Sequence, residues 1–256
     1  MILSRRNSKI KILQWSLALT FLLVSAFTLA DEINVAVASN FSDVVKEIAK
    51  RFKDETGHKV ILALGSTGKH YAQIHNGAPF DIFLAADSER PILLEKEGIA
   101  LSGSRFTYAV GKLVLWSPVA GVVDENGNVL NGETFHHLAI ANPKLAPYGK
   151  AAEQVMRGMA VWDKLQRRIV RGQNIGQAYQ FIESGNAELG FIAFSQIKAP
   201  DRDIAGSFWE PSQSLYNPVE QQAVQLRENK AAHDFLDYMK SEKAREIIRE
   251  YGYGLP

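Results

Sequence analysis

From residue 33 onward, short runs rich in β-branched residues alternate with longer runs whose apolar residues recur every three or four positions. Runs of the first kind are typical of strands, and runs of the second kind are typical of amphipathic helices. Each expected strand tends to end in a small or polar residue directly before the next helix begins. This alternation predicts an α/β fold.

The expected elements continue to the end of the chain. The expected strands cover residues 33–38, 60–64, 81–85, 112–116, 138–141, 168–170, 188–193 and 223–226. The expected helices cover residues 41–55, 67–76, 88–97, 149–159, 175–184 and 231–251, and residues 121–132 form a turn-rich loop. We expect two lobes, each with its own sheet: residues 31–112 with 217–256 form lobe 1, and residues 113–216 form lobe 2.

Residues 1–30 follow the plan of a signal peptide. An apolar run over residues 12–30 follows four basic residues, Arg5, Arg6, Lys9 and Lys11. Thr28 and Ala30 lie three and one positions before Asp31, which is the spacing that a signal peptidase reads. We therefore expect cleavage near Ala30 and a periplasmic protein. The alternative is an uncleaved anchor, since a run of 19 residues can just span a bilayer.

The composition limits the function further. The sequence contains no cysteine, which excludes a disulfide framework, a thiolate metal site, a cysteine nucleophile and a lipid-modified cysteine. Without residues 1–30, which hold four basic and no acidic residues, the formal charge changes from +1 to −3. A mildly acidic chain is a poor candidate for nucleic acid. We expect a freely diffusing monomer that binds no nucleic acid.

Four expected helices begin directly after a stretch of small or polar residues. These stretches are residues 39–40, 65–68, 147–149 and 173–176. A helix start presents unpaired N–H donors and about half a positive charge, which suits an anion. If four such starts met, each contributing up to roughly 2 kcal/mol, affinity would be about micromolar without any Arg or Lys. The alternative is that Ser, Thr and Asn are ordinary N-caps here.

Two catalytic interpretations of the residues around Ser66 fail. Residues 65–69 suggest a phosphate-binding loop, but that motif needs Gly at Ala63 and Ser or Thr at His70. Ser66 also lies in no Gly-x-Ser-x-Gly turn, which argues against a serine hydrolase.

Other titratable residues favour structural roles. Asp81 and Asp87 flank an apolar strand, and Asp87 stands where a helix N-cap is expected. His136 and His137 are neighbours that point to opposite faces of an extended segment, so they make a poor metal site. We expect no cofactor and no residue that ligates a metal directly.

Several segments resemble those of the periplasmic molybdate-binding proteins. They are VAVASNF at 35–41, GSTG at 65–68, AQI at 72–74, GAPFDIFLAAD at 77–87, Gly190-Phe191 and Tyr251-Gly252-Tyr253. The resemblance covers essentially the whole chain after residue 30. It implies a two-lobed, type II periplasmic-binding-protein fold with the ligand cleft between the lobes.

The resemblance also implies a set of ligand-binding residues. They are Ser39, Asn40, Ser66, Thr67, Tyr148 and Ile175. Ser39 and Asn40 would supply a hydroxyl and amides. Thr67 would supply a hydroxyl, with Ser66 beside it, and Ile175 would supply its backbone N–H. Ala193 departs from the family, because many members carry there a Tyr whose phenol donates to the ligand. Some members give only an amide at the position of Tyr148, and in others a Tyr there provides the phenol from the other side.

These observations lead to one functional prediction and two alternatives. Every group in the set donates, which suits fully deprotonated dianions, whereas phosphate keeps a proton near neutral pH and needs an acceptor. We expect a non-enzymatic receptor that captures molybdate and tungstate, with molybdenum present only as the oxyanion, and delivers it to the permease of an ABC importer. The first alternative is a receptor for sulfate or another tetrahedral oxyanion. The second is an exported enzyme acting on phosphate or sulfate esters.

Overall fold

The computed structural model describes residues 31–200 and 202–256, which contain two five-stranded mixed sheets. The first sheet has the strand order β2-β1-β3-β10-β4, and the second has the order β7-β6-β8-β5-β9. We call each sheet, with the helices packed on it, a lobe. The predicted signal peptide lies outside the described residues.

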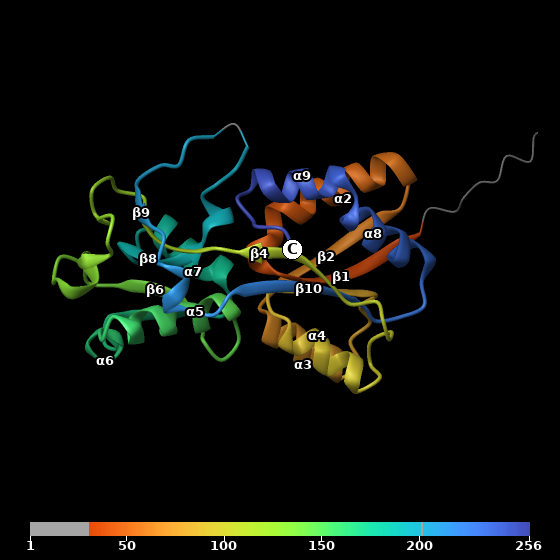
Figure 1. The fold of residues 1–256 in the computed structure, drawn as a ribbon, viewed down its shortest axis with the longest axis horizontal. Coiled ribbons are helices and arrows are strands. Elements are labelled where there is room, and N and C mark those ends of the chain that lie inside the picture. Colours follow the sequence, from red (N-terminus) through yellow and green to blue (C-terminus); the bar gives the residue numbers. More distant parts are fainter. Residues whose placement is uncertain (1–30, 201) are drawn as a thin grey trace, which may run out of the picture. The chain divides into compact units, whose positions relative to one another are not determined.

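The first lobe is built around a sheet covered on both faces (Figure 1). Its strands are β1 (Glu32–Ala38), β2 (Lys59–Gly65), β3 (Ile82–Ala85), β4 (Phe106–Gly111) and β10 (Val219–Gln225). Its helices are α2 (Ser42–Thr56), α3 (Thr67–His75), α4 (Glu89–Lys96), α8 (Lys230–Lys240) and α9 (Glu242–Glu250), and the 3-10 turn η1 (Ser39–Phe41) leads into α2. Helices α2, α8 and α9 contribute to one buried apolar cluster, and α3 and α4 contribute to another. The inner strand β3 is wholly apolar and buried, as expected for a strand covered on both faces.

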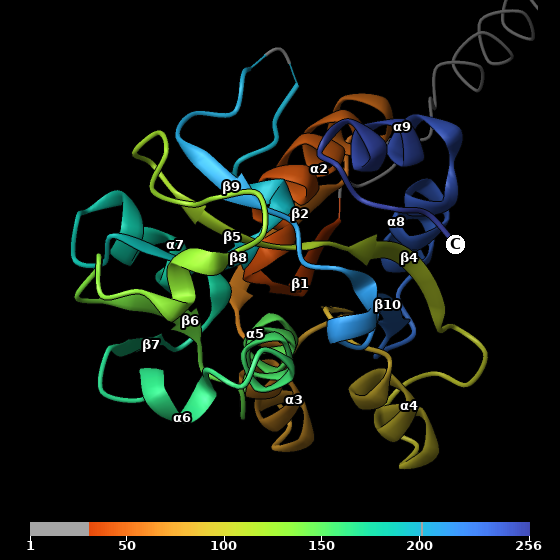
Figure 2. The same cartoon turned by 60° about the vertical axis from the view of Figure 1, so that its left-hand side comes forward.

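The second lobe repeats this plan with fewer helices (Figure 2). Its strands are β5 (Leu113–Ser117), β6 (Leu138–Ala141), β7 (Ile169–Gly172), β8 (Leu189–Ala193) and β9 (Ser207–Trp209). Its helices are α5 (Pro147–Gly158), α6 (Trp162–Leu165) and α7 (Ile175–Glu183), with short 3-10 turns η2 (Asn128–Asn131), η3 (Phe194–Gln196) and η4 (Gln213–Leu215). Strands β5, β6 and β8 are fully buried and form the centre of this core.

The chain crosses between the lobes twice. Strand β4 ends at Gly111 and β5 begins at Leu113, so Lys112 alone separates the two sheets at the first crossing. The chain returns to the first lobe through the segment before β10. Strand β10 then pairs antiparallel with both β3 and β4. The pairing of β10 with β4 contains a β-bulge, because Gln221 pairs with Ala109 whereas Gln222 pairs with Thr107.

The predicted α/β class with two lobes is confirmed, but some elements differ from the prediction. The expected helix over residues 231–251 is wrong as a single helix, because the backbone is extended at Ser241 (ψ 154°). The Ser241 side chain accepts a hydrogen bond from Ala244 N at 3.3 Å and caps α9 instead. Strand β10 begins four residues before the expected position, and strands β4 and β9 and helix α6 were not predicted. No helix within the described residues combines the length and apolar character that a membrane span requires.

Candidate functional site

A small pocket lies where four helix starts meet, and its lining comes from both lobes. The lining residues are Ala38, Ser39, Asn40, Gly65, Ser66, Thr67, Ala86, Ala146, Pro147, Tyr148 and Ile175. All six predicted ligand-binding residues are therefore brought together. The pocket volume, counted as space for the centre of a water molecule, is about 10 Å³. That is about the room that one water needs, so with the lobes in this position the pocket suits only a compact solute.

The first-lobe wall comes from two strand ends. Ser39 and Asn40 follow β1 and form the 3-10 turn that leads into α2. Ser66 follows β2 and caps α3, because its hydroxyl accepts a hydrogen bond from Lys69 N at 3.3 Å. Thr67 is the first residue of α3, and its Oγ1 accepts a hydrogen bond from Ala86 N at 3.1 Å. This bond ties the start of α3 to the residue that follows β3.

The second-lobe wall comes from the first turns of α5 and α7. Helix α5 begins with Pro147, whose fixed φ suits the first helical position, and Tyr148 follows. Helix α7 begins with Ile175 after the N-cap Asn174, whose Oδ1 accepts a hydrogen bond from Gln177 N at 2.9 Å. The first backbone N–H groups of an α-helix have no partner within their own helix. Both turns therefore present amide donors at the pocket.

Electrostatics at the pocket come from neutral groups. Of the described residues that line it, none has a charged side chain. Positive potential comes instead from the helix starts, each equivalent to about half an elementary charge. Such a site attracts an anion without a counter-ion and offers no carboxylate acceptor.

The two walls contact each other directly. Ser39 Oγ donates to Asn174 Oδ1 and accepts from Gly176 N, both at 3.1 Å. Gly68 N, in the first turn of α3, donates to Leu145 O at 2.8 Å. These bonds join the lobes on both sides of the pocket.

The phenol of Tyr148 points toward the crossing between the lobes. Its Oη accepts a hydrogen bond from Gln221 Nε2 at 3.3 Å, and it lies so close to Gly111 that a Cβ there would overlap it. Burial raises the pKa of Tyr148 well above 10 and the pKa of nearby Tyr253 to about 12, so both phenols stay neutral. Ala193 is buried at the end of β8, and its N–H donates to Gln196 Oε1 at 2.9 Å.

The titratable residues considered as alternatives have structural partners. Asp81 Oδ2 accepts from Asn34 N at 2.7 Å, and Asp87 pairs with Arg90 at the rim of a second pocket. Burial raises the pKa of Asp87, although the charge of Arg90 acts in the opposite direction. The backbone N–H groups of His136 and His137 donate to the carboxylate of Glu188. Among the described residues, no group of three or more His, Asp or Glu side chains is placed to hold a metal ion.

Several residues at the site were not predicted from the sequence. Ala86 lines the pocket and anchors Thr67, while Gln221, Ser195 and Tyr108 belong to a buried polar network behind Asn40. One sequence signal was available for Gln221. Glu220, Gln221 and Gln222 lie between Val219 and Ala223, and a polar residue in a buried strand needs hydrogen-bonding partners.

A two-lobed α/β protein with a small, uncharged, donor-rich pocket between its lobes is a receptor for a compact solute. The chain matches the family described as bacterial extracellular solute-binding protein over residues 33–254, and it belongs to that family. This membership agrees with the prediction that the chain is not an enzyme.

Relatives with similar sequences extend over nearly the whole chain. The molybdate-binding protein ModA of Azotobacter vinelandii is 52% identical over 229 residues, which cover 88% of this chain and 91% of the relative. The molybdate-binding protein ModA of Rhodobacter capsulatus is 48% identical over 227 residues, 88% of each chain. The solved structure of the Azotobacter vinelandii periplasmic molybdate-binding protein superposes with a TM-score of 0.86 at 46% identity and covers 88% of this chain and 99% of its own.

Proposed function

We propose that this chain is a periplasmic receptor that captures molybdate, and also tungstate, and delivers it to the membrane permease of an ABC importer. Two relatives at 52% and 48% identity carry the name molybdate-binding protein, which supports this proposal. The observation that carries it is the pocket itself, where four helix starts meet and no lining side chain is charged.

The chemistry of the donors selects the class of ligand. Backbone N–H groups only donate, and a hydroxyl facing a dianion also acts as a donor. A fully deprotonated tetrahedral dianion accepts from every one of these groups. Phosphate near neutral pH keeps a proton that requires an acceptor, and an unpaired proton donor in a dehydrated site carries a large penalty.

Each predicted residue has a specific role in this proposal. Ser39 and Thr67 donate hydroxyl protons, and Ser66 shapes the turn beside Thr67. Asn40 contributes its backbone N–H, because its side-chain Nδ2 already donates to Gln221 Oε1 at 2.8 Å and to Tyr253 Oη at 3.0 Å. Tyr148 and Ile175 contribute backbone N–H groups at the starts of α5 and α7. The phenol of Tyr148 acts on lobe closure, because its oxygen contacts Gln221.

Export and assembly form part of the same proposal. Residues 1–30 act as a signal peptide cleaved near Ala30, and the mature receptor is monomeric. Residues 31–112 with 217–256 and residues 113–216 move as two bodies that close over the ion. The end of β4 at Gly111 and the start of β10 at Val219 support these boundaries.

The experiment is isothermal titration of residues 31–256 with molybdate, tungstate, sulfate and phosphate at fixed pH and salt. We expect one-to-one binding of molybdate and tungstate, with sulfate weaker by about a hundredfold, equivalent to about 2.7 kcal/mol. Tight sulfate binding would mean that the ligand is the smaller anion sulfate and that helix starts still bind it. Absence of binding by all four anions would mean that the four helix starts are ordinary caps.

A further inference from the structure

Behind the pocket, a buried carboxamide contacts both lobes. Gln221 lies in β10 and has no exposed surface (0%). Its Oε1 accepts from Asn40 Nδ2 at 2.8 Å, and Tyr108 Oη donates either to this Oε1 or to Ala85 O, both at 3.1 Å. Its Nε2 donates to Tyr148 Oη at 3.3 Å. Asn40 belongs to the first lobe and Tyr148 to the second, so one side chain contacts a residue of each pocket wall.

The two ends of a carboxamide match the partners at this position. The side chain accepts on one side, from Asn40, and donates on the other, to Tyr148. A carboxylate would lack the donor and an aliphatic side chain would lack both. Either change would leave buried polar groups without partners.

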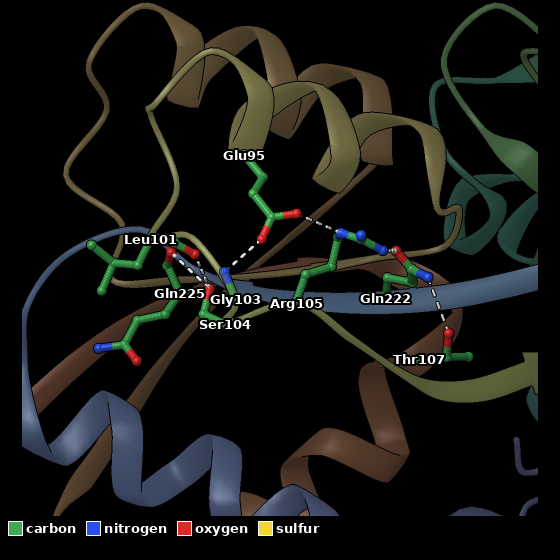
Figure 3. A network of polar contacts seen from close by, with 8 residues as sticks. All are labelled: Glu95, Leu101, Gly103, Ser104, Arg105, Thr107, Gln222 and Gln225. Atoms are coloured by element: carbon green, nitrogen blue, oxygen red, sulfur yellow. Dashed lines mark hydrogen bonds and ion pairs between the residues drawn. The ribbon is translucent and has the colours of Figure 1, made fainter.

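The neighbouring strand residue faces another network. Gln222 Oε1 accepts from Arg105 Nη1 at 2.9 Å, and Gln222 Nε2 donates to Thr107 Oγ1 at 3.0 Å (Figure 3). Arg105 also pairs with Glu95 of α4 at 2.9 Å. All these partners of Gln222 belong to the first lobe. The β-bulge between the two glutamines thus separates a contact across the lobes from a contact within one lobe.

The surrounding residues strengthen the contact across the lobes. Ser195, in the 3-10 turn η3 after β8, donates to Asn40 O at 3.1 Å or to Tyr253 Oη at 2.8 Å. The phenol of Tyr148 approaches the bare backbone of Gly111, and Gln221 Nε2 lies 2.8 Å from where a Cβ of Gly111 would be. Gly111 is the last residue of β4, directly before the chain enters the second lobe. The bonds of Gln221 therefore depend on how the lobes are placed.

We propose that Gln221 is a positioning residue for ligand capture, whose carboxamide ties Asn40 of the first lobe to Tyr148 of the second and so prolongs the closed arrangement. The ligand part of this inference rests on the proposed molybdate function. Closure brings the pocket walls together, and the same closure completes the bonds of Gln221. Loss of the carboxamide therefore acts on the lifetime of the closed protein and leaves encounter with the anion unchanged.

The test compares Gln221→Met with the matched control Gln222→Met, which removes the neighbouring carboxamide from the first-lobe network. Stopped-flow measurements should show that Gln221→Met raises the molybdate dissociation rate roughly ten- to hundredfold and changes the association rate by less than about threefold. Gln222→Met should leave both rates close to those of the wild type. Equal effects of the two variants would overturn the proposal, because they would reflect a general loss of stability.

A second variant tests the proposal even if Gln221→Met does not fold. Tyr148→Phe removes the acceptor oxygen and keeps the ring, and it should raise the dissociation rate in the same way. In the Tyr148→Phe background, Gln221→Met should have a clearly smaller effect than in the wild type, because the two residues share one bond. Additive effects, or unchanged dissociation in Tyr148→Phe, would contradict a tie between Gln221 and Tyr148.

A ligand-free measurement separates this inference from the molybdate function. The amide of Gly68 donates to Leu145 O across the lobes, so its hydrogen-exchange rate reports lobe opening. Without anions, exchange at Gly68 should accelerate at least about tenfold in Gln221→Met and stay near the wild-type rate in Gln222→Met. Failure of the wild type to bind molybdate would reject the proposed function, and exchange at Gly68 would still decide the role of Gln221. Unchanged exchange at Gly68 in Gln221→Met would overturn the proposed role of Gln221.

Discussion

Ser39 of the first lobe accepts a hydrogen bond from the backbone N–H of Gly176 in the second lobe at 3.1 Å, and it donates to Asn174 Oδ1 at the same distance. The hydroxyl proposed to bind the oxyanion therefore also joins the two pocket walls. Asn174 Oδ1 is the cap acceptor for Gln177 N, so it keeps a partner when the Ser39 proton turns to a ligand. Ligand binding can redirect this one proton without leaving a buried group unpaired.

Ser39→Ala should weaken molybdate binding by roughly 1–3 kcal/mol, because the dianion loses a donor and the walls lose the bonds that Ser39 makes between them. Isothermal titration measures the change. The control is Ser102→Ala, which removes a hydroxyl from an exposed residue away from the pocket and should leave the affinity unchanged. Unchanged affinity in Ser39→Ala would remove this residue from the site.

Thr67→Val should reduce both affinity and stability. The substitution keeps the shape of the side chain but removes the oxygen that accepts from Ala86 N. We expect a loss of roughly 1–3 kcal/mol in the free energy of unfolding and a weaker interaction with molybdate. Chemical denaturation and titration measure the two effects separately. Thr67→Ser retains the hydroxyl and should preserve most of the molybdate affinity and of the free energy of unfolding. If Thr67→Ser lost as much of both as Thr67→Val, the cause would be the packing of the methyl group.

Gly68→Ala should impair lobe closure specifically. A Cβ at Gly68 would lie 3.0 Å from Leu145 O and 3.2 Å from Leu145 Cα, both backbone atoms of the other lobe. It would also lie 3.2 Å from Arg90 Nη2 in its own lobe, but this atom is the far end of a flexible side chain. Within its own lobe the substitution favours helix α3 by up to about 1 kcal/mol, since Ala is a better helix former than Gly. Molybdate affinity should fall while the thermal midpoint of the ligand-free protein does not.

A matched glycine substitution controls for Gly68→Ala. Gly132 has a φ of −84°, and a Cβ there would meet only ordinary contacts, the nearest at 3.4 Å. Gly132→Ala should leave molybdate affinity unchanged. A full-affinity Gly68→Ala protein would show that the approach of Gly68 to Leu145 is not needed for binding.

Stability should depend on pH through His70, which is buried under the α3 start. Burial lowers the pKa of His70 from 6.5, and the charge of Lys69 lowers it further. The hydrogen bond with Gln73 acts in the opposite direction. Because the unfolded chain binds this proton more readily, the free energy of unfolding should fall as the pH drops below about 6.5 toward the folded pKa. The contribution of His70 is fully present above that range.

Two histidine variants test this dependence. In His70→Gln, denaturation curves between pH 7.5 and 4.5 should show a flatter decline than in the wild type, over roughly the range where histidine titrates. His75→Gln, which changes an exposed histidine of the same helix, is the matched comparison variant. Identical slopes in His70→Gln and the wild type would exclude His70 as the source.

Local patterns were sufficient to predict most of the fold. Strands such as β1 and helices such as α2 differ from their expected bounds by one residue, because apolar periodicity and a closing glycine are local signals. Helices α8 and α9 were merged, since their apolar period continues across Ser241, where capping of Ala244 N outweighs helix continuation. Strand β4 was missed because its pairing with β10 across a bulge depends on residues more than a hundred positions away.

The candidate site could also be predicted only in part. Helix starts are visible in the sequence because capping residues precede them. The resemblance to the molybdate-binding proteins then implied which six residues at these starts would bind the ligand. The directions of their side chains could not be predicted. The Nδ2 of Asn40 and the phenol of Tyr148 both point to Gln221, which is 181 residues from Asn40 in sequence. Such contacts depend on the packing of the two lobes.

The most direct test of the account is a crystal structure of residues 31–256 grown with molybdate, with diffraction measured at the molybdenum absorption edge. We predict one strong anomalous peak in the pocket between Ser39, Thr67, Tyr148 and Ile175. The oxygens of that ion should lie within hydrogen-bonding distance of the backbone N–H groups at the starts of α5 and α7. A peak elsewhere on the protein, or oxygens held by Lys or Arg side chains, would contradict the claim that helix starts bind the oxyanion.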